Sequence, residues 1–166
     1  DAQRNHCAVS TVAISPKADG AALVLLASDK ACTQYQLQPV AEWLQHCSLG
    51  GPPAMPLVLA ADAATALLAR TKTPWSDLAA IELHDAFAVQ GLQWQAMLGQ
   101  HGMDANMLNQ HGGGIARGHP IGASGAIALV RVLGDLGAGP AGALGLAAVA
   151  GAGGLGSAGL VKRSHS

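Results

Sequence analysis

The chain has 166 residues and a mass of 16.6 kDa, which suits a single domain rather than a multidomain enzyme. Half of its residues are hydrophobic and only 11% are charged, so the composition excludes intrinsic disorder. A net charge of −1 leaves no basic patch to neutralise phosphates, which argues against a nucleic-acid-binding protein. So few charges on so small a chain indicate that a partner or another copy covers much of the surface.

Predicted strands and helices alternate along the chain. The first strand is a continuous apolar run from Ala21 to Ser28, which is typical of a strand that is covered on both faces. The patterns that follow predict, in order, a short helix over Asp29 to Tyr35, a strand over Pro39 to Ser48, a helix over Leu57 to Arg70, a strand over Ala79 to Leu83, helices over Phe87 to Gly99 and Gly122 to Leu136, and two strands over Leu146 to Ala150 and Leu155 to Val161. This order indicates an α/β fold in which helices are layered on a mixed sheet of five strands.

An uncharged stretch from Leu136 to Val161 is long enough on paper to span a membrane. Its apolar residues are mostly Ala and Gly, and four glycines crowd between residues 151 and 156. Each glycine weakens a helix by about 1 kcal/mol relative to alanine. The two short strands predicted here, joined by a Gly-rich turn, explain the stretch better than a membrane span does.

The cysteines and histidines do not form a pattern that is typical of metal ligands. The chain has three cysteines, an odd number, and none of them forms a CxxC pair. No two histidines are spaced at i and i+4, so we expect neither a metal site nor a disulfide framework. This cysteine usage is typical of a reducing compartment, and we expect a cytoplasmic protein.

Two stretches carry residue types that are suited to catalysis. His84 to Phe87 lies where a predicted strand passes into a helix, and strand ends in α/β sheets converge on ligand sites. Asn109 to Gly125 is rich in glycine, which brings main-chain amides close to a ligand. Within it, His119 precedes a helix whose N-terminus carries partial positive charge, so the imidazole stays neutral and available as a base. The alternative interpretation is a closely packed Gly-rich loop with structural histidines.

These stretches resemble the sequence signatures of the thiolases. The block NQHGGGIARGHPIGASG, from Asn109 to Gly125, is similar to the family's C-terminal signature. The sequence HDAF, at His84 to Phe87, resembles the family's Asn-Glu-Ala-Phe motif in a histidine-bearing variant. Ser15 to Ala22 resembles the stretch that opens the C-terminal half of a thiolase, and Ala150 to Ala158 resembles the motif that closes it. The match covers essentially the whole chain, in the expected order.

The resemblance implies a layered αβα unit that forms the C-terminal half of a two-half enzyme, with the active site between the halves. Residues 1–166 would be this C-terminal domain, and their start would be the remainder of a linker from a missing N-terminal half. The implied partners are an N-terminal half or second subunit and an acyl-CoA, in a homo- or hetero-oligomer. Nothing resembles the segment of the family's nucleophilic cysteine, and the cysteines present lie outside the catalytic motifs, at Cys7, Cys32 and Cys47.

The resemblance also assigns roles to single residues. His119 would be the base that activates the missing thiol, and His84 would hold a water or donate a hydrogen bond to the thioester oxygen. Ser15, Gly118 and Gly153 would contact the substrate, a coenzyme A thioester, and no other cofactor is implied. The implied activity is an acyl transfer of fatty acid metabolism, either 3-oxoacyl-CoA thiolysis or Claisen condensation.

One position departs from the family pattern. Thiolases have a second cysteine, which takes a proton from the α-carbon of acetyl-CoA, where this sequence has Ala150. Alanine cannot move a proton, and general acid–base catalysis contributes about 10²–10⁴-fold, so a standard condensation would be strongly impaired. Two alternatives to the acyltransferase therefore stay open: a non-catalytic thiolase-like partner subunit, and a retro-aldolase of the sterol-carrier type that acts on coenzyme A esters.

Overall fold

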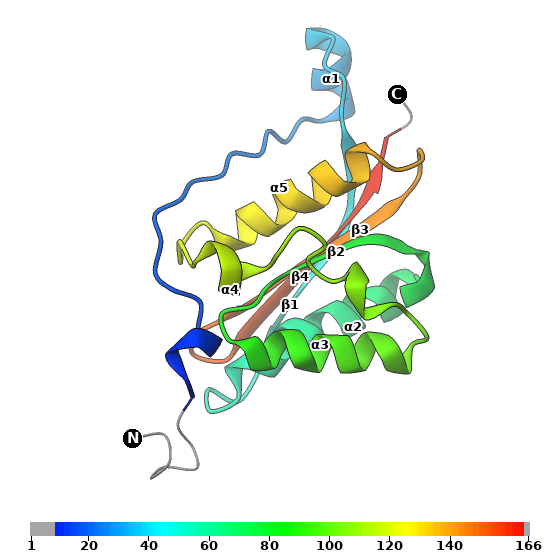
Figure 1. The fold of residues 1–166 in the computed structure, drawn as a ribbon. Helices are drawn as coiled ribbons and strands as arrows, with labels where there is room; N and C mark the ends of the chain where they lie inside the picture. Colours follow the sequence, from blue (N-terminus) through cyan, green and yellow to red (C-terminus); the bar gives the residue numbers. More distant parts are fainter. Residues whose placement is uncertain (1–8, 165–166) are drawn as a thin grey trace.

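A mixed sheet of four strands forms the centre of the computed structural model, which describes residues 9–164 (Figure 1). The strands are β1 (Ala41–Gly50), β2 (Leu78–His84), β3 (Leu144–Gly151) and β4 (Leu155–Arg163). Their order in the sheet is β1-β4-β3-β2. Strand β4 is antiparallel to both of its neighbours, whereas β2 and β3 are parallel. The two central strands come from the uncharged stretch near the C-terminus, and no helix within residues 9–164 is long and apolar enough to cross a membrane.

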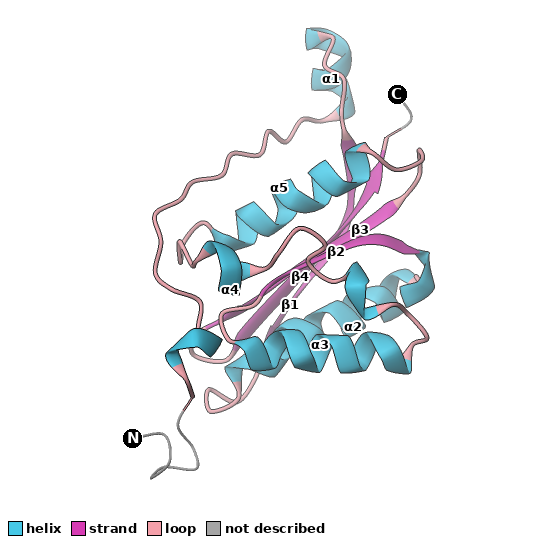
Figure 2. Ribbon diagram, viewed as in Figure 1, coloured by secondary structure: helices cyan, strands magenta, loops and turns pink. Residues whose placement is uncertain are grey.

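Helices cover both faces of this sheet, as Figure 2 shows. The longer helices are α2 (Leu59–Thr71) and α3 (Ala88–Gln100) on one side and α5 (Ser124–Gly137) on the other. Two shorter helices complete the set, α1 (Asp29–Tyr35) and α4 (Gly114–Arg117). The result is the layered αβα arrangement that the sequence predicts.

Alternation along β3 explains why helices pack on both faces. Leu146 is fully buried in the core cluster that lies against α2 and α3, whereas Ala147 belongs to a second cluster formed with α5. Gly145 faces α5 so closely that a side chain there would collide with Val132 and Leu136. The apolar run of small residues thus lets α5 approach the sheet.

The prediction of a fifth strand at Ala21 to Ser28 is wrong. These residues form an extended connection that runs past α5 to α1 without joining the sheet (Figure 1). The residues Leu23, Leu25 and Leu26 are 92%, 79% and 76% exposed, so the segment is not buried as its apolar sequence predicts. A strand forms only by pairing, and neither edge of this sheet accepts the segment as a partner.

The other predicted elements are confirmed, with shifts at their ends. No end shifts by more than two residues, and β3, for example, begins two residues before the predicted strand at Leu146. Strand β2 extends one residue beyond its predicted end and therefore includes His84. Helix α5 begins at Ser124 rather than at Gly122, because residues 120–123 form a turn instead. These shifts place His84 at the last position of a strand and Ser124 at the first position of a helix.

Candidate active site

The structure brings together the two histidines that the sequence singles out. His84 ends β2 and His119 lies in the loop before α5, yet their ring centroids are only 4.0 Å apart with the planes inclined by 29°. Two stacked imidazoles at the end of a strand are placed to act on one reacting group. The sequence predicts both residues, but it does not predict the stacking.

His84 is a buried, neutral imidazole. Its residue is only 5% exposed, and its Nε2 atom has no hydrogen-bond partner among residues 9–164. The pKa of His84 is lowered to about 4, mainly by burial and to a smaller extent by the charges of His119 and Arg117. At neutral pH the ring therefore carries no charge, and Nε2 is a buried atom whose hydrogen-bonding capacity is not used within residues 9–164.

His119 is oriented by the first residue of α5. Its Nδ1 lies 2.7 Å from Oγ of Ser124, and that hydroxyl lies 3.4 Å from the Pro120 carbonyl oxygen, to which it donates. With its proton on the carbonyl, the hydroxyl accepts from Nδ1–H, and the lone pair of the ring is on Nε2. Burial lowers the pKa of His119, which also favours the neutral form of this ring.

A small cavity of about 130 Å³ adjoins His84. Its walls include His84, Arg117, Gly118 and Ser124, together with residues 19–21 of the segment that opens the chain. Gly118 has φ of +89°, and a Cβ atom there would lie 2.6 Å from the Cβ of Ala18. Only glycine fits this wall, so the predicted substrate-contacting residue Gly118 does lie beside the histidines.

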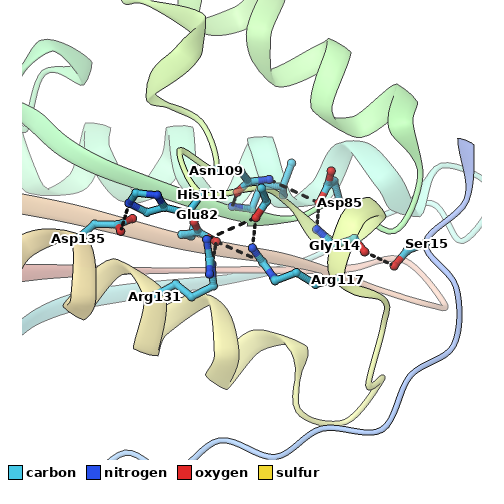
Figure 3. A network of polar contacts seen from close by, with 11 residues as sticks. Ser15, Glu82, Asp85, Asn109, His111, Gly114, Arg117, Arg131 and Asp135 are labelled. Atoms are coloured by element: carbon cyan, nitrogen blue, oxygen red, sulfur yellow. Dashed lines mark hydrogen bonds and ion pairs between the residues drawn. The ribbon is translucent and has the colours of Figure 1, made fainter.

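A network of polar contacts holds the Gly-rich loop, whose Gly114 packs closely against His84. Figure 3 shows the residues of this network. Asp85 accepts hydrogen bonds from the main-chain N–H of Gly114 and, at 3.4 Å, from Nδ2 of Asn109. The Oδ1 atom of Asn109 in turn accepts from the N–H of Leu83 at 2.8 Å. Because Asp85 and Leu83 flank His84, these contacts fix the loop directly to the end of β2.

The segment that opens the chain connects the two histidine motifs. The Ser15 hydroxyl donates to the Gly114 carbonyl at 2.6 Å, and the Ser15 N–H donates to the Ala86 carbonyl at 2.9 Å. Pro16 accepts from the His119 N–H at 2.7 Å. Ser15 is thus buried behind the loop in this structure, and its predicted contact with coenzyme A stays a prediction.

Other predicted positions lie away from this cavity. Gly153 lies in the turn between β3 and β4, with φ of +82° and open space where a side chain would start. Cys32 is a free thiol on α1, and Cys47 is a free thiol buried in β1. Cys7 lies outside the described residues.

Comparison with known proteins identifies the family of this chain. The family model described as "Thiolase, C-terminal domain" matches residues 37–163, which is most of the chain. The chain belongs to the thiolase family. The match begins at residue 37, after the extended segment at Ala21 to Ser28.

Curated thiolases resemble the chain over this region. It is 42% identical over 115 residues to an acetyl-CoA acetyltransferase of Synechocystis sp., which covers 69% of this chain and 28% of that protein. It is 41% identical over 118 residues to a beta-ketoadipyl-CoA thiolase of Acinetobacter baylyi, covering 71% and 29% respectively. The chain therefore spans less than a third of the length of these relatives.

Solved thiolase structures have the same fold. The Acat5 thiolase of Ascaris suum, crystallised with coenzyme A, superposes with a TM-score of 0.73 at 34% identity, covering 82% of this chain and 34% of that one. The acetyl-CoA acetyltransferase of Bacillus anthracis superposes with a TM-score of 0.72 at 27% identity, with the same coverage. The thiolase fold predicted from the motifs is confirmed.

Ala150 of this thiolase domain lies on the strand next to that of His84. In the parallel pair of β2 and β3, His84 is opposite Val149, so Ala150 is one residue further along the neighbouring strand. Its methyl group is partly buried and packs against the core cluster on the α2 side. Neighbouring strands are about 4.8 Å apart, so the main chain at Ala150 runs close to that at His84.

The sequence does not reveal which other residues hold the site together. Asp85, Asn109 and Ser124 stand inside the motifs, where only their spacing points to a role. Glu82 and Arg131 stand outside them, and their signal is a charge in an otherwise apolar element. Only the folded structure shows that all of them converge on the loop that carries His119.

Proposed function

We propose that this chain contributes the histidine side of a thiolase active site and that the nucleophilic cysteine comes from an N-terminal half or a second subunit. The reaction would be 3-oxoacyl-CoA thiolysis or the reverse Claisen condensation. The observation that carries the proposal is the pair of neutral, stacked imidazoles of His84 and His119 beside a cavity. The identity to proteins named acetyl-CoA acetyltransferase and beta-ketoadipyl-CoA thiolase supports it.

In the proposed acyl transfer, His119 first takes up a proton and later returns it. The cysteine thiol gives its proton to Nε2 of His119, and its sulfur attacks the thioester carbonyl to form a tetrahedral oxyanion. His84, with its proton on Nε2, which has no hydrogen-bond partner among residues 9–164, would donate a hydrogen bond to that oxygen. When the carbonyl re-forms, the carbon–sulfur bond to coenzyme A breaks, and His119 returns its proton to the departing sulfur.

Features of the fold support a partner that completes the domain. The chain spans less than a third of its curated relatives, and the matched domain begins only at residue 37. The preceding apolar segment presents Leu23, Leu25 and Leu26 to solvent, although its sequence is typical of a buried strand. An N-terminal thiolase half that accepts this segment as a strand would cover these side chains.

Ala150 favours a second candidate, a non-catalytic thiolase-like subunit. An alanine cannot perform the proton transfer at the α-carbon, which condensation and thiolysis both need. A retro-aldolase acting on coenzyme A esters is a further alternative, since it does not require the second cysteine. Aldol cleavage of a 3-hydroxyacyl-CoA by the purified protein would identify that alternative directly.

The proposal is tested with the full-length protein or complex that contains this chain. Thiolysis of acetoacetyl-CoA is measured for the wild type and for His119→Ala and His84→Ala, with His101→Ala as the control. His101 follows α3, is exposed, and stacks on Trp75 rather than on the site. We expect both site variants to lose activity by about 10²-fold or more and the control to retain it.

Two results would overturn the proposal. The absence of both thiolysis and condensation in the wild-type protein would contradict an acyltransferase. In that case, a gain of activity in Ala150→Cys would identify the chain as a non-catalytic subunit, namely a thiolase that lost its second cysteine. Full activity of His119→Ala would contradict the role of that histidine even in an active enzyme.

A further inference from the structure

We propose that Glu82, Arg117 and Arg131, joined through the Gly112 carbonyl, form a closed polar ring that positions the two histidines. The inference rests on the proposed function, because it concerns how the same site is held in its working geometry. Figure 3 shows this ring between β2, the Gly-rich loop and α5. We call it the Glu82 ring.

Each group in the Glu82 ring takes part in two of the hydrogen bonds that form the ring. Arg131 donates to Glu82 Oε2 from Nε at 3.0 Å and to the Gly112 carbonyl from Nη2 at 3.4 Å. Arg117 donates to the same carboxylate oxygen from Nη2 at 3.4 Å and to the same carbonyl from Nη1. The carboxylate and the carbonyl are thus bridged twice, by two separate guanidinium groups.

The Glu82 ring joins the three elements that carry the site. Glu82 stands two residues before His84 on β2, so both side chains are on the same face of the strand. Arg117 stands two residues before His119 in the loop. Arg131 stands seven residues after Ser124 on α5, which is two turns along the same helix face. Each element contributes one member of the ring and one member of the site.

Charge balance alone does not require the second arginine. The side chain of Glu82 is completely buried, and a buried carboxylate needs a partner. Arg131 provides that partner at the shorter distance, so a single arginine already neutralises the charge. Arg117 is therefore a second cation beyond the one that the charge requires. Its contact with the Gly112 carbonyl links the two ends of the loop segment from Gly112 to Arg117. In some proteins a buried ionic group is retained because it specifies one geometry rather than because it adds stability, and a positioning role for Arg117 is of this kind.

The experiment compares Arg117→Met and Arg117→Lys with a matched control, Arg70→Met. Arg70 is an exposed residue of α2, away from the Glu82 ring. In the full-length protein or complex, kcat and KM for thiolysis are measured together with amide hydrogen exchange over residues 112–119. Amides of this loop are hydrogen-bonded in the structure, Gly118 to Gly114 at 2.7 Å and His119 to Pro16 at 2.7 Å, so they report directly on its order.

We expect Arg117→Met to lose about 10²-fold in kcat, since displacing a catalytic group by about 1 Å costs that much. Exchange over residues 112–119 should rise in this variant and stay unchanged in Arg70→Met. Arg117→Lys should remain impaired, because a single ammonium group does not form the two-armed bridge of a guanidinium.

Two results would overturn the Glu82 ring as a positioning device. One is wild-type protection of residues 112–119 in Arg117→Met, and the other is a full recovery of kcat in Arg117→Lys. Failure of the proposed function is a separate outcome, seen as an inactive wild type. In that case the exchange measurement still decides whether the ring orders the loop.

Discussion

Gly114 is the position where a single methyl group should test the geometry of the site. Its main chain lies against the imidazole of His84, and the variant Gly114→Ala adds a Cβ atom to this contact. That atom would lie 2.6 Å from Cε1 and 2.8 Å from Nδ1 of His84, and 3.1 Å from the carbonyl oxygen of Asp85. Non-bonded carbon atoms prefer about 3.5–4.0 Å, so the imidazole must move by about 1 Å.

The size of the effect follows from this displacement. Forcing an extra methyl group into a well-packed site costs about 1–3 kcal/mol of stability. Moving a catalytic imidazole by about 1 Å costs about 10²-fold in rate. The backbone of Gly114 does not have a positive φ, so the predicted loss comes from the contact and not from backbone strain.

The assay is thiolysis by the full-length protein or complex, together with thermal unfolding. Gly134→Ala on α5 is the control, since nothing lies within 4 Å of an added Cβ there. An alanine in the middle of a helix should stabilise by about 0.5–1 kcal/mol and leave activity unchanged. If Gly114→Ala were as active and as stable as the wild type, the packing of the loop on His84 would be refuted.

Three further predictions concern single features of the domain. The pKa of His84 is lowered from 6.5 to about 4, mainly by burial, so the unfolded chain takes up the proton at a higher pH than the folded chain does. The free energy of unfolding should therefore be highest above pH 6.5 and fall by up to about 3 kcal/mol toward pH 4. Urea titrations should show a flatter pH profile in His84→Asn, and a profile identical to that of the wild type would contradict the shift. Ser124→Ala removes the partner of His119 Nδ1 and should lower kcat more than KM in the thiolysis assay, whereas unchanged kcat would exclude an orienting role. The isolated chain should self-associate in light scattering through Leu23 and Leu25, and less so when both are changed to Gln; a monodisperse wild-type monomer would argue against an uncovered apolar face.

Most helices and strands of this domain can be predicted from the sequence because each depends on a pattern within a few neighbouring residues. Alternation and apolar periodicity are properties of a few neighbouring residues, so the strands that became β3 and β4 and the helix that became α5 can be predicted from short windows. The same rule gives the wrong result at Ala21 to Ser28. There the pattern is that of a buried strand, but the pairing it needs is not supplied by the sheet of this chain.

The candidate site is predicted in part for a similar reason. His84 and His119 belong to contiguous motifs, and each motif is visible without knowledge of the other. The contacts that hold them depend on residues far apart in the chain, such as Glu82 and Arg131, whose side chains meet only in the folded domain. Spacing along the sequence cannot reveal such a contact, because it depends on the packing of α5 on β2.

The central claim is that His84 and His119 serve a thiol that another part of the protein supplies. The most direct measurement is the rate of thiol alkylation against pH in the full-length protein or complex, for the wild type and for His119→Ala. The account predicts a cysteine whose pKa lies below the ordinary value of about 8.5 and returns toward it in the variant. A thiol whose alkylation profile does not respond to His119→Ala, or the absence of any reactive cysteine, would contradict it.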